Sequence, residues 1–404
     1  MGIAFSRSPT NAGLIPTKWQ GELLKQTYEA NPLKDYMGTG PDSIIQIEND
    51  LKTQKGDTIR SWINVLPTGN GQGNDGTYLT NEEDLSLKAF QYRIGERGHG
   101  FNGPNGLTSD QLAAMDLKAY ATGNIKDWIA MIQTADIISA LSGFKNMSVA
   151  GQVTGGLAVD ASDAQITTVN QVAPTRSATA IRYFCGGQST AGVINRVANV
   201  ASISGTTGYI AGCKVAEYLK MMAEANIKSD GTLLTKIRPI MIGGKPHYLW
   251  LVDQYMAKAI RNDSEWLANY RYSAPRSEES PVFTDAIGMI GNVIVKESHL
   301  LHRRTGKNGI TAPEYFDATT EAVVNTISVC RSLFLGAQAV KLGWAMLPTY
   351  KDGYKDMPAA TKWACYTQML YGVKKTCLAS TAEPPVDTAD TEYGCIIADV
   401  AIIP

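Results

Sequence analysis

The sequence predicts an α+β fold, because its strand-like and helical patterns occupy separate stretches of the chain. Two strand-like segments flank a glycine-rich loop early in the sequence, and one long helical pattern follows them. The rest of the chain mixes short strands with shorter helices, and it contains no tandem repeat. Runs of strands followed by runs of helices are typical of the α+β class.

The first forty residues are predicted to form an arm and not the start of a core. Thr17-Lys-Trp-Gln20 has the form of a helix capping box, and Trp19 and Leu23 are spaced four residues apart on the same helix face. Asn31-Pro32 should end this helix, since the residue before proline avoids the helical region. A helix of about three turns is marginal alone. We therefore expect the arm to lie on another surface, such as a neighbouring subunit.

Residues 51–100 are predicted to form a long two-stranded tongue with a flexible tip. The segment 58–65 is rich in strand-forming residues, and the segment 85–94 alternates apolar and polar side chains. The loop between them contains four glycines within residues 67–78, so it cannot build a core of its own. A lone hairpin is barely stable in water. The tongue is therefore expected to lean on another surface.

Residues 108–141 predict one long helix that starts at the capping box Thr108-Ser-Asp-Gln111. An apolar face recurs along it at helical spacing: Leu112, Met115, Ala119, Ile125, Trp128, Ile129, Ile132 and Ile138. Gly123-Asn124 is the point at which the helix is expected to kink or split. We expect the face to be buried within the subunit, so that Trp128→Ala costs about 3–5 kcal/mol.

The remainder of the chain is predicted to be a mixed α+β region. Short strands and loops are expected over 144–210, and a helix over 212–225. Two strands at 237–242 and 247–252 should be joined tightly through Gly243-Gly244. A helical segment over 253–270, interrupted at Asn262-Asp263-Ser264, and a closing strand over 394–403 complete the pattern.

Composition and charge exclude several classes of protein. Of the 404 residues, 44% are hydrophobic and 19% are charged, so the chain can bury a core. Lys and Arg number 37 and Asp and Glu 38, giving a formal charge of −1. Proteins that bind nucleic acid through its phosphates usually carry more basic than acidic residues, so sequence-specific DNA binding is not expected. No apolar run approaches the roughly 20 residues of a membrane helix, and no secretory signal is recognisable. Synthesis in a cytoplasm is expected.

Two motifs suggest ligand chemistry, and both are better explained as surface segments. Gly71-Gln-Gly-Asn-Asp-Gly76 has the G-x-G-x-x-G form, but no apolar helix follows it, and nearby carboxylates would repel a phosphate. His299 and His302 are three residues apart, whereas an HExxH zinc helix needs a spacing of four. We therefore predict no cofactor and no metal site. Substituting both histidines by alanine should leave the protein's assembly intact.

Other reactive residue types are also better explained by packing. Gly187-Gln-Ser-Thr-Ala191 lacks the final glycine of a nucleophile elbow. Asp387 and Asp390 follow Pro384-Pro385 in a solvated loop, and the six cysteines form no C-x-x-C pair. Four tryptophans among apolar neighbours are expected in the core: Trp250, Trp266, Trp344 and Trp363. No catalytic residue is predicted, and the chain is not expected to be an enzyme.

The order of segments, an arm, a glycine-tipped tongue, a long helix and a mixed region, resembles the major capsid protein of tailed double-stranded-DNA phages, with the Hong Kong 97 fold. Local sequence resembles one subgroup, the capsid proteins of N4-like short-tailed phages. The matching patches are Lys55-Gly-Asp-Thr-Ile59, Asn81-Glu-Glu83, His247-Tyr-Leu-Trp-Leu-Val252, Asn262-Asp-Ser-Glu-Trp266, Ser280-Pro-Val-Phe-Thr-Asp-Ala-Ile-Gly288, Asn292-Val-Ile-Val295, Phe334-Leu-Gly-Ala-Gln-Ala339 and Gly372-Val-Lys-Lys375.

The resemblance implies a domain organisation and a set of partners. It implies an N-arm (1–50), an extended E-loop (51–100), a peripheral domain with a spine helix (101–190), an axial domain (191–346) and a return to the peripheral domain (347–404). Copies of the chain would form hexamers and pentamers of an icosahedral virion shell around double-stranded DNA, without sequence-specific binding and without a membrane. Scaffold, portal and decoration proteins are further implied partners.

Contacts between subunits are expected from the arm and the tongue tip. The candidate residues combine apolar and aromatic side chains with amide and hydroxyl groups: Trp19, Leu23, Thr68, Asn70, Gln72, Asn74 and Tyr78. The alternative from another class is an enzyme with a glycine-rich active-site lid at 67–80, although few titratable groups lie near that loop. A secreted adhesin or surface-layer protein is a third reading, which the absent signal disfavours.

Overall fold

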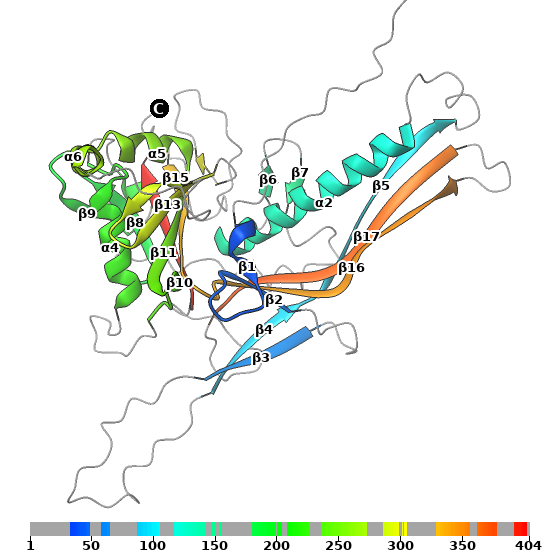
Figure 1. Cartoon of the computed structure of the whole chain (residues 1–404), viewed down its shortest axis with the longest axis horizontal. Coiled ribbons are helices and arrows are strands. Elements are labelled where there is room, and N and C mark those ends of the chain that lie inside the picture. Colours follow the sequence, from blue (N-terminus) through cyan, green and yellow to red (C-terminus); the bar gives the residue numbers. More distant parts are fainter. Residues whose placement is uncertain are drawn as a thin grey trace, which may run out of the picture. The chain divides into compact units, whose positions relative to one another are not determined.

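The computed structural model describes residues 33–48, 58–64, 87–105, 117–142, 147–149, 153–155, 180–198, 200–203, 208–225, 236–272, 286–298, 301, 303–304, 329–355, 362–377 and 392–401. Within these residues, helices and strands follow one another in the order that the α+β prediction requires, which confirms the class (Figure 1). None of the described helices is long and apolar enough to cross a membrane.

The chain divides into two compact units. The smaller comprises Met1–Tyr28, Gly98–Trp128 and Tyr350–Thr367, and the larger comprises Glu29–Arg97, Ile129–Thr349 and Gln368–Pro404. One helix and three strands each have residues in both units. The chain therefore passes from one unit to the other inside regular elements and not only through loops.

A nine-stranded sheet forms the centre of the larger unit. Its main path runs β12 (Ala286–Ile290), β13 (Val293–Glu297), β11 (Lys245–Val252), β15 (Val329–Leu335), β18 (Cys395–Ala401), β8 (Tyr183–Gln188) and β9 (Ile194–Arg196), with β10 (Ile240–Ile242) on β11 and β14 (Arg303–Arg304) on β15. The pairs β11–β13 and β18–β8 are parallel, and the other pairs along the path are antiparallel.

The central strands of this sheet are buried along their whole length. Every residue of β15 and β18 is buried, and so are the last six residues of β11. Strands that are covered on both faces read as nearly continuous apolar runs, and the sequences of β18 and the end of β11 have this form. The prediction of a closing strand at the C-terminal end is confirmed.

Three helices belong to the same unit. Helix α4 (Cys213–Glu224) packs against β8, β9, β12 and β13. Helices α5 (Gln254–Arg261) and α6 (Ser264–Tyr272) follow β11 directly (Figure 1). The Asp253 side chain caps α5 by accepting a hydrogen bond from the backbone N–H of Tyr255 at 3.3 Å. The predicted interruption between the two helices is also confirmed.

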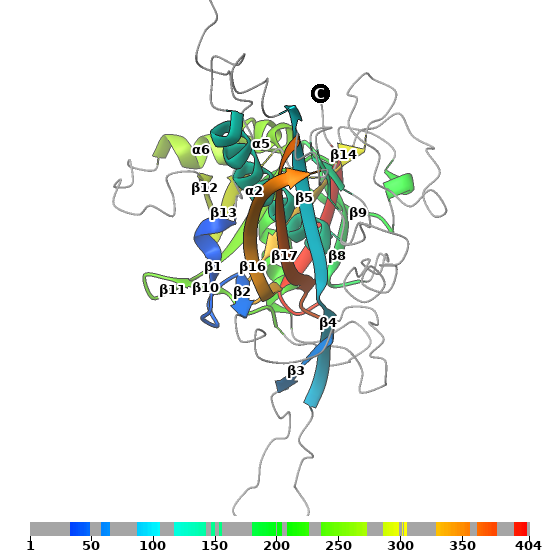
Figure 2. The ribbon, with the colours of Figure 1, turned by 90° about the vertical axis from the view of Figure 1, so that its right-hand side faces the viewer.

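A five-stranded sheet has the order β1 (Met37–Gly38), β2 (Ile45–Glu48), β16 (Val340–Lys355), β17 (Lys362–Lys375) and β5 (Gly95–Asn105). Figure 2 shows β16, β17 and β5 side by side. The short 3₁₀ helix η2 (Lys34–Tyr36) precedes β1, and Leu33, Ile44 and Ile45 around it are fully buried. The prediction that the first forty residues lie outside a core is therefore wrong for residues 33–38, which pack into the core and the sheet. The sequence analysis did not predict β5, β16 or β17.

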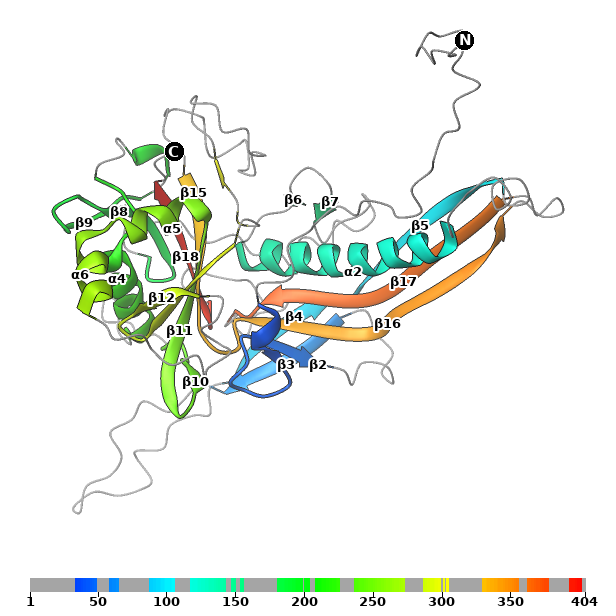
Figure 3. The same ribbon diagram turned by 45° about the horizontal axis from the view of Figure 1, so that its top comes forward.

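Helix α2 (Leu117–Ser142) is unbroken through Gly123, so the expected kink or split at that glycine is wrong. The predicted start at Thr108 lies outside the described residues. In the larger unit, the C-terminal half of the helix lies against the five-stranded sheet (Figure 3), and nearly all of its residues from Ile132 to Ser142 are buried.

The predicted apolar face of α2 is only partly correct. Ile125, Ile132 and Ile138 are buried, but Trp128 is half-buried. The Trp128 ring stacks on His99, with 4.8 Å between the ring centroids. Because part of the indole is exposed, Trp128→Ala should cost less than the 3–5 kcal/mol expected for a fully buried tryptophan, about 1–2 kcal/mol.

Two pairs of strands complete the described structure. Strands β3 (Thr58–Asn64) and β4 (Leu87–Arg93) form an antiparallel ribbon with Thr58 opposite Arg93 and Asn64 opposite Leu87. This register confirms the two strands of the predicted tongue, while its tip at 65–86 lies outside the described residues. Strands β6 (Met147–Val149) and β7 (Val153–Gly155) form a second antiparallel pair. The short 3₁₀ helix η6 (Val200–Ser202) follows β9.

Candidate functional site

The β3–β4 ribbon is fixed to the five-stranded sheet at the end where Thr58 pairs with Arg93, which we call its near end. Two aromatic residues of β4 make this attachment. Tyr92 is fully buried, and its hydroxyl donates a hydrogen bond to Glu48 Oε2 of β2 at 2.9 Å. Burial and the Glu48 carboxylate raise the pKa of Tyr92 well above its usual value. The Tyr92 hydroxyl is therefore a permanent hydrogen-bond donor at neutral pH.

The second anchor is Phe90, which is 1% exposed. The ammonium groups of Lys341 on β16 and Lys374 on β17 lie 5.8 Å and 5.5 Å from the centroid of its ring. Lys341 Nζ also donates a hydrogen bond to Ser61 Oγ of β3 at 3.3 Å. Both strands of the ribbon are thus held against the five-stranded sheet at this end. Residues 65–86 connect the other ends of the two strands.

A polar cluster joins β8 to the first residues of α4 and α6, and it is centred on Asp263. Asp263 Oδ2 accepts hydrogen bonds from Gln188 Nε2 and from the backbone N–H of Cys213, each at 2.9 Å. Asp263 Oδ1 accepts from the backbone N–H of Glu265 at 3.1 Å. One carboxylate therefore caps two helices, because the first N–H groups of each helix have no partner within it. We call these residues the Asp263 cluster.

Gln188 and Gly212 complete this cap. Gln188 Oε1 accepts a hydrogen bond from the backbone N–H of Lys214 at 2.9 Å. A Cβ atom on Gly212 would lie only 2.2 Å from the Gln188 side-chain amide, so a larger residue there would displace this amide from its hydrogen bonds. Lys214 Nζ bridges Glu217 at 3.1 Å and Glu265 at 2.9 Å, and these hydrogen bonds raise the pKa of Lys214 to about 12.

A pocket of about 310 Å³ opens beside the Asp263 cluster. Ile210, Ala211 and Ala259 supply apolar walls, and Tyr255 and Lys258 of α5 also line it. The turn that follows β8 contributes Ser189, whose Oγ accepts a hydrogen bond from the backbone N–H of Val193 at 3.2 Å. The lining therefore combines apolar side chains with polar and charged ones.

The β10–β11 hairpin exposes an apolar side chain of β10 beside its turn. Ile242 pairs with Lys245 across Gly243-Gly244, whose φ angles are +57° and +77°. Two positive φ angles in a two-residue loop favour glycine and match the twist of a hairpin. Met241 beside this turn is 46% exposed. The predicted tight connection between the two strands is confirmed.

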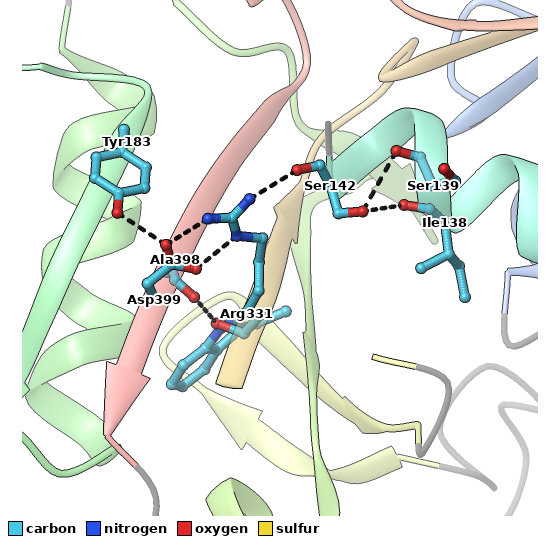
Figure 4. Close-up of polar contacts among 9 residues, drawn as sticks. Ile138, Ser139, Ser142, Tyr183, Arg331, Ala398 and Asp399 are labelled. Atoms are coloured by element: carbon cyan, nitrogen blue, oxygen red, sulfur yellow. Dashed lines mark hydrogen bonds and ion pairs between the residues drawn. The ribbon is translucent and has the colours of Figure 1, made fainter. Parts of the chain in front are cut away.

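A buried ion pair ties the end of α2 to the nine-stranded sheet. Arg331 Nε and Nη2 on β15 donate to the two carboxylate oxygens of Asp399 on β18, each at 2.7 Å (Figure 4). Arg331 Nη1 donates to the carbonyl of Ser142 at 3.0 Å, and the Tyr183 hydroxyl donates to Asp399 Oδ2 at 2.8 Å. Arg331 is 1% exposed and Asp399 is fully buried. Burial and Asp399 raise the pKa of Tyr183 well above its usual value.

A second buried pair holds the same helix against the five-stranded sheet. Asp136 of α2 accepts a hydrogen bond from Arg97 Nη2 of β5 at 2.8 Å and another from the hydroxyl of Tyr371 on β17. The pKa of Tyr371 is raised strongly, first by burial and then by Asp136. Two elements that sequence analysis did not predict, β5 and β17, thus supply the partners of a helix that it did.

The inter-subunit candidates named from the sequence all lie outside the described residues: Trp19, Leu23, Thr68, Asn70, Gln72, Asn74 and Tyr78. The same is true of His299 and His302, of the glycine motif 71–76, and of Asp387 and Asp390. In the described part of the chain, no group of three or more His, Cys, Asp or Glu residues could hold a metal ion.

The described sequence motifs take part in packing. The segment from Gly187 to Ala191 ends β8 and turns toward β9, so it is not the strand-to-helix turn of a nucleophile elbow. Trp250 is fully buried and Trp344 is 7% exposed, as expected for core residues. Trp266 is only partly buried, so its predicted place in the core is wrong, and the side chain of Trp363 lies outside the described residues. All six cysteines are buried and free, and burial raises the pKa of Cys213 and of Cys395 to about 12. Those two thiols stay protonated at neutral pH.

Replacing Asp263 by alanine is expected to destabilise the larger unit by about 2–3 kcal/mol, because two helix caps are lost together and each contributes about 1 kcal/mol. Asp263→Asn should cost less, since the amide oxygen still accepts. Urea unfolding of each variant measures the difference. Equal stabilities of the alanine variant and the unmodified protein would contradict the capping role.

His247 is expected to make the subunit less stable in acid. Burial lowers the pKa of His247 below its usual value, and Lys245 acts in the same direction, although a hydrogen bond with the backbone of Asn292 opposes them. The folded protein therefore favours the neutral ring. The stability is present above about pH 6.5, the pKa of an unfolded histidine, and is lost as the pH falls through the lower pKa of the folded state.

The urea midpoint should accordingly fall between pH 7.5 and 5 by more in the unmodified protein than in His247→Gln. The variant is the matched control, because every other titrating group is common to both chains. Parallel pH profiles would show that the pKa of His247 is the same in the folded and the unfolded state, which would contradict this prediction.

Comparison with known proteins adds independent information. Residues 8–380 match the family described as phage capsid protein. The chain is 23% identical over 389 residues to the major capsid protein of Pseudomonas phage KPP25, covering 95% of this chain and 94% of that protein. Its fold resembles the capsid of Ralstonia phage GP4, with a TM-score of 0.72, 18% identity, and coverage of 100% and 98% of the two chains.

Other solved structures share this fold. The capsid asymmetric unit of cyanophage Pam1 gives a TM-score of 0.65 at 17% identity, with 99% of each chain covered. The acid-stable capsid of Helicobacter pylori bacteriophage KHP30 gives 0.64 at 15% identity, covering 99% of this chain and 98% of the other. The similarity therefore extends over the whole length of these chains.

Proposed function

The chain belongs to the phage capsid protein family, and from this premise we propose that it is the major shell subunit of its phage, joining other copies through its tongue and arm in hexamers and pentamers of an icosahedral capsid. The family is one of structural proteins with the Hong Kong 97 fold, so the chain is a component of the virion and not an enzyme. Copies of the chain build the shell.

The observation that carries the proposal is the way the β3–β4 ribbon is attached. Its near end is fixed by Phe90 and Tyr92 to the five-stranded sheet, and its two strands continue toward a glycine-rich segment. A two-stranded ribbon is barely stable without a further surface. A neighbouring copy supplies that surface in a closed shell, and the residues named from the sequence for this contact are Thr68, Asn70, Gln72, Asn74 and Tyr78. Trp19 and Leu23 of the arm play the same part.

Finer features of the capsid follow from the resemblance of the sequence patches. We propose that the phage is a short-tailed phage of the N4-like group, and that the shell assembles in the host cytoplasm. Scaffold, portal and decoration proteins are its proposed further partners. The enclosed double-stranded DNA is not bound in a sequence-specific way, which agrees with a formal charge of −1.

The proposed domains are an N-arm at 1–50, an E-loop at 51–100, a peripheral domain at 101–190, an axial domain at 191–346 and a return to the peripheral domain at 347–404. Hydrogen bonding within the sheet favours two changes to this scheme. Strand β18 pairs with β15 and β8 in the nine-stranded sheet, and β8 pairs with β9. We therefore assign residues 183–188 and 395–401 to the axial domain.

The proposal is tested by negative-stain electron microscopy of the purified protein, expressed alone and together with its phage's scaffold protein. Shells, tubes or ring-shaped capsomers are expected. A small compact particle at every protein concentration, in both preparations, would contradict the proposal. The alternative of an enzyme with a lid at 67–80 receives no support from the family.

Shortening residues 67–80 to a two-residue turn should leave the folding of the subunit nearly unchanged and impair closure of the shell. Ordering each residue of this loop costs about 1–2 kcal/mol of backbone entropy, which contacts with a neighbour must offset. A Gly-Ser segment of the same length is the matched control, since it keeps the reach of the tongue without its side chains. Normal shells from the shortened chain would contradict the role of the tongue.

A further inference from the structure

The larger unit carries two dissimilar surfaces at the two ends of one strand. Strand β11 begins directly after the Gly243-Gly244 turn and ends directly before Asp253, which caps α5. Its eight residues separate these two points by about 26 Å at 3.3 Å per residue. Figures 1 and 3 both show β10 and α5 toward opposite ends of β11.

The first surface, which we call the turn surface, consists of Met241 and residues 243–246. These residues are exposed, and Met241 is 46% accessible although it is apolar. The two positive φ angles fix the shape of the turn before any contact is made. A pre-shaped loop loses little conformational entropy on binding, so the turn surface is suited to insertion into a hollow.

The second surface, which we call the pocket surface, is the 310 Å³ pocket beside the Asp263 cluster together with the neighbouring Val193. Its walls include the apolar side chains of Ile210, Ala211 and Ala259. Val193, four residues after the pocket residue Ser189, is 60% exposed. The pocket surface thus combines a hollow with apolar area that is open to solvent.

The two surfaces carry charged groups of opposite sign. Lys245 is the one charged residue of the turn surface. The residues that line the pocket include one carboxylate, Asp263, and one ammonium group, Lys258. Beside them, Lys214 is paired with Glu217 and Glu265. Lys245 and Asp263 carry opposite charges, as groups that face each other across an interface commonly do.

We propose that the turn surface of one copy docks into the pocket surface of the next copy around a capsomer, with Met241 entering the pocket and Lys245 facing its acidic side. This inference rests on the proposed function. Two different patches on one subunit give a head-to-tail contact, which closes into a ring when the rotation between neighbours allows it. An exposed methionine beside a fixed turn is suited to a pocket whose walls include Ile210, Ala211 and Ala259.

Cysteine cross-linking in assembled particles tests the contact. The variant Met241→Cys/Ala259→Cys places one thiol on each surface, and the six native cysteines are buried. Treatment with a short bis-maleimide should give a ladder of covalently linked copies. The control is Met221→Cys/Ala259→Cys, because Met221 on α4 is 64% exposed but belongs to neither surface. This control should form particles but give no ladder of covalently linked copies.

A second pair of variants covers the case in which the cysteines disturb assembly. Met241→Asp should lower the yield of particles by at least about tenfold, equivalent to about 1.4 kcal/mol, while Met241→Leu should stay within about twofold. Intact particles without a ladder, equal ladders from both cysteine pairs, or normal assembly of Met241→Asp would each overturn the proposal. Failure of the unmodified chain to form particles would instead contradict the proposed function.

Discussion

Replacing Arg331 by methionine should lower the free energy of unfolding of the dissociated subunit by about 3–5 kcal/mol, because it leaves Asp399 charged and buried without its partner. Asp399 is fully buried, and Arg331 donates to both of its carboxylate oxygens at 2.7 Å. The change also removes the donor to the Ser142 carbonyl at the end of α2. Urea unfolding of the full-length chain measures the loss.

Two further variants make this result specific. Arg238→Met removes an exposed ion pair with Asp42, whose side chains are 45% and 48% accessible, so it should cost less than about 1 kcal/mol. The double variant Arg331→Met/Asp399→Leu should be more stable than Arg331→Met alone, since no uncompensated charge remains. If the double variant were the less stable of the two, an unpaired charge would not be the cause.

Truncating Trp250 to alanine should cost about 3–5 kcal/mol, because it opens a cavity in the most buried part of the nine-stranded sheet. Trp250 on β11 is fully buried, and its indole Nε1 donates a hydrogen bond to Ser332 Oγ on β15 at 3.1 Å. Ser332 Oγ in turn donates to the carbonyl of Ala398 on β18 at 3.0 Å. The side chain therefore links three neighbouring strands.

Trp250→Phe is the matched comparison, and it should cost about 1–2 kcal/mol. Phenylalanine keeps most of the buried apolar area, and Ser332 keeps the Ala398 carbonyl as a partner, so only one hydrogen bond and a small volume are lost. The midpoints of urea unfolding should rank the unmodified chain, Trp250→Phe and Trp250→Ala in falling order. Equal costs of the two substitutions would show that the cavity contributes nothing.

The elements that sequence analysis predicts well are those with a strong local signal. Asn262-Asp263-Ser264 indicates a helix break because Asp is a common cap, and the structure shows Asp263 in that role. Gly243-Gly244 indicates a tight turn for a similarly local reason. The apolar run of β18 indicates a buried strand. Each prediction depends on neighbouring residues alone.

The features that sequence analysis misses depend on pairing between distant parts of the chain. Arg331 is the one charged residue in a largely apolar strand, which indicates that it needs a partner of opposite charge. No local feature of the sequence identifies this partner as Asp399, which lies 68 residues away. The same holds for Asp263, whose link to Gln188 joins residues 75 apart. Strands β5 and β17 supply partners for α2, and β5 was missed because glycine is common in it and rare in strands.

The expected kink of α2 at Gly123 is wrong for a related reason. Glycine in a helix interior costs only about 1 kcal/mol relative to alanine. Tertiary packing offsets that cost, because the helix is anchored through Asp136 to Arg97 and at its end through the Ser142 carbonyl to Arg331. A local propensity of this size does not decide the course of a helix that is held at several points.

Hydrogen exchange of residues 67–80, compared between dissociated subunits and assembled particles, tests most directly whether the chain is a shell subunit whose tongue contacts a neighbouring copy. The account predicts fast exchange of the backbone amides in the free subunit and strong protection in the particle. The buried strands β15 and β18 should be protected in both states and serve as the internal reference. Equal protection of 67–80 in the two states would contradict the account, because the tongue would then pack within its own chain.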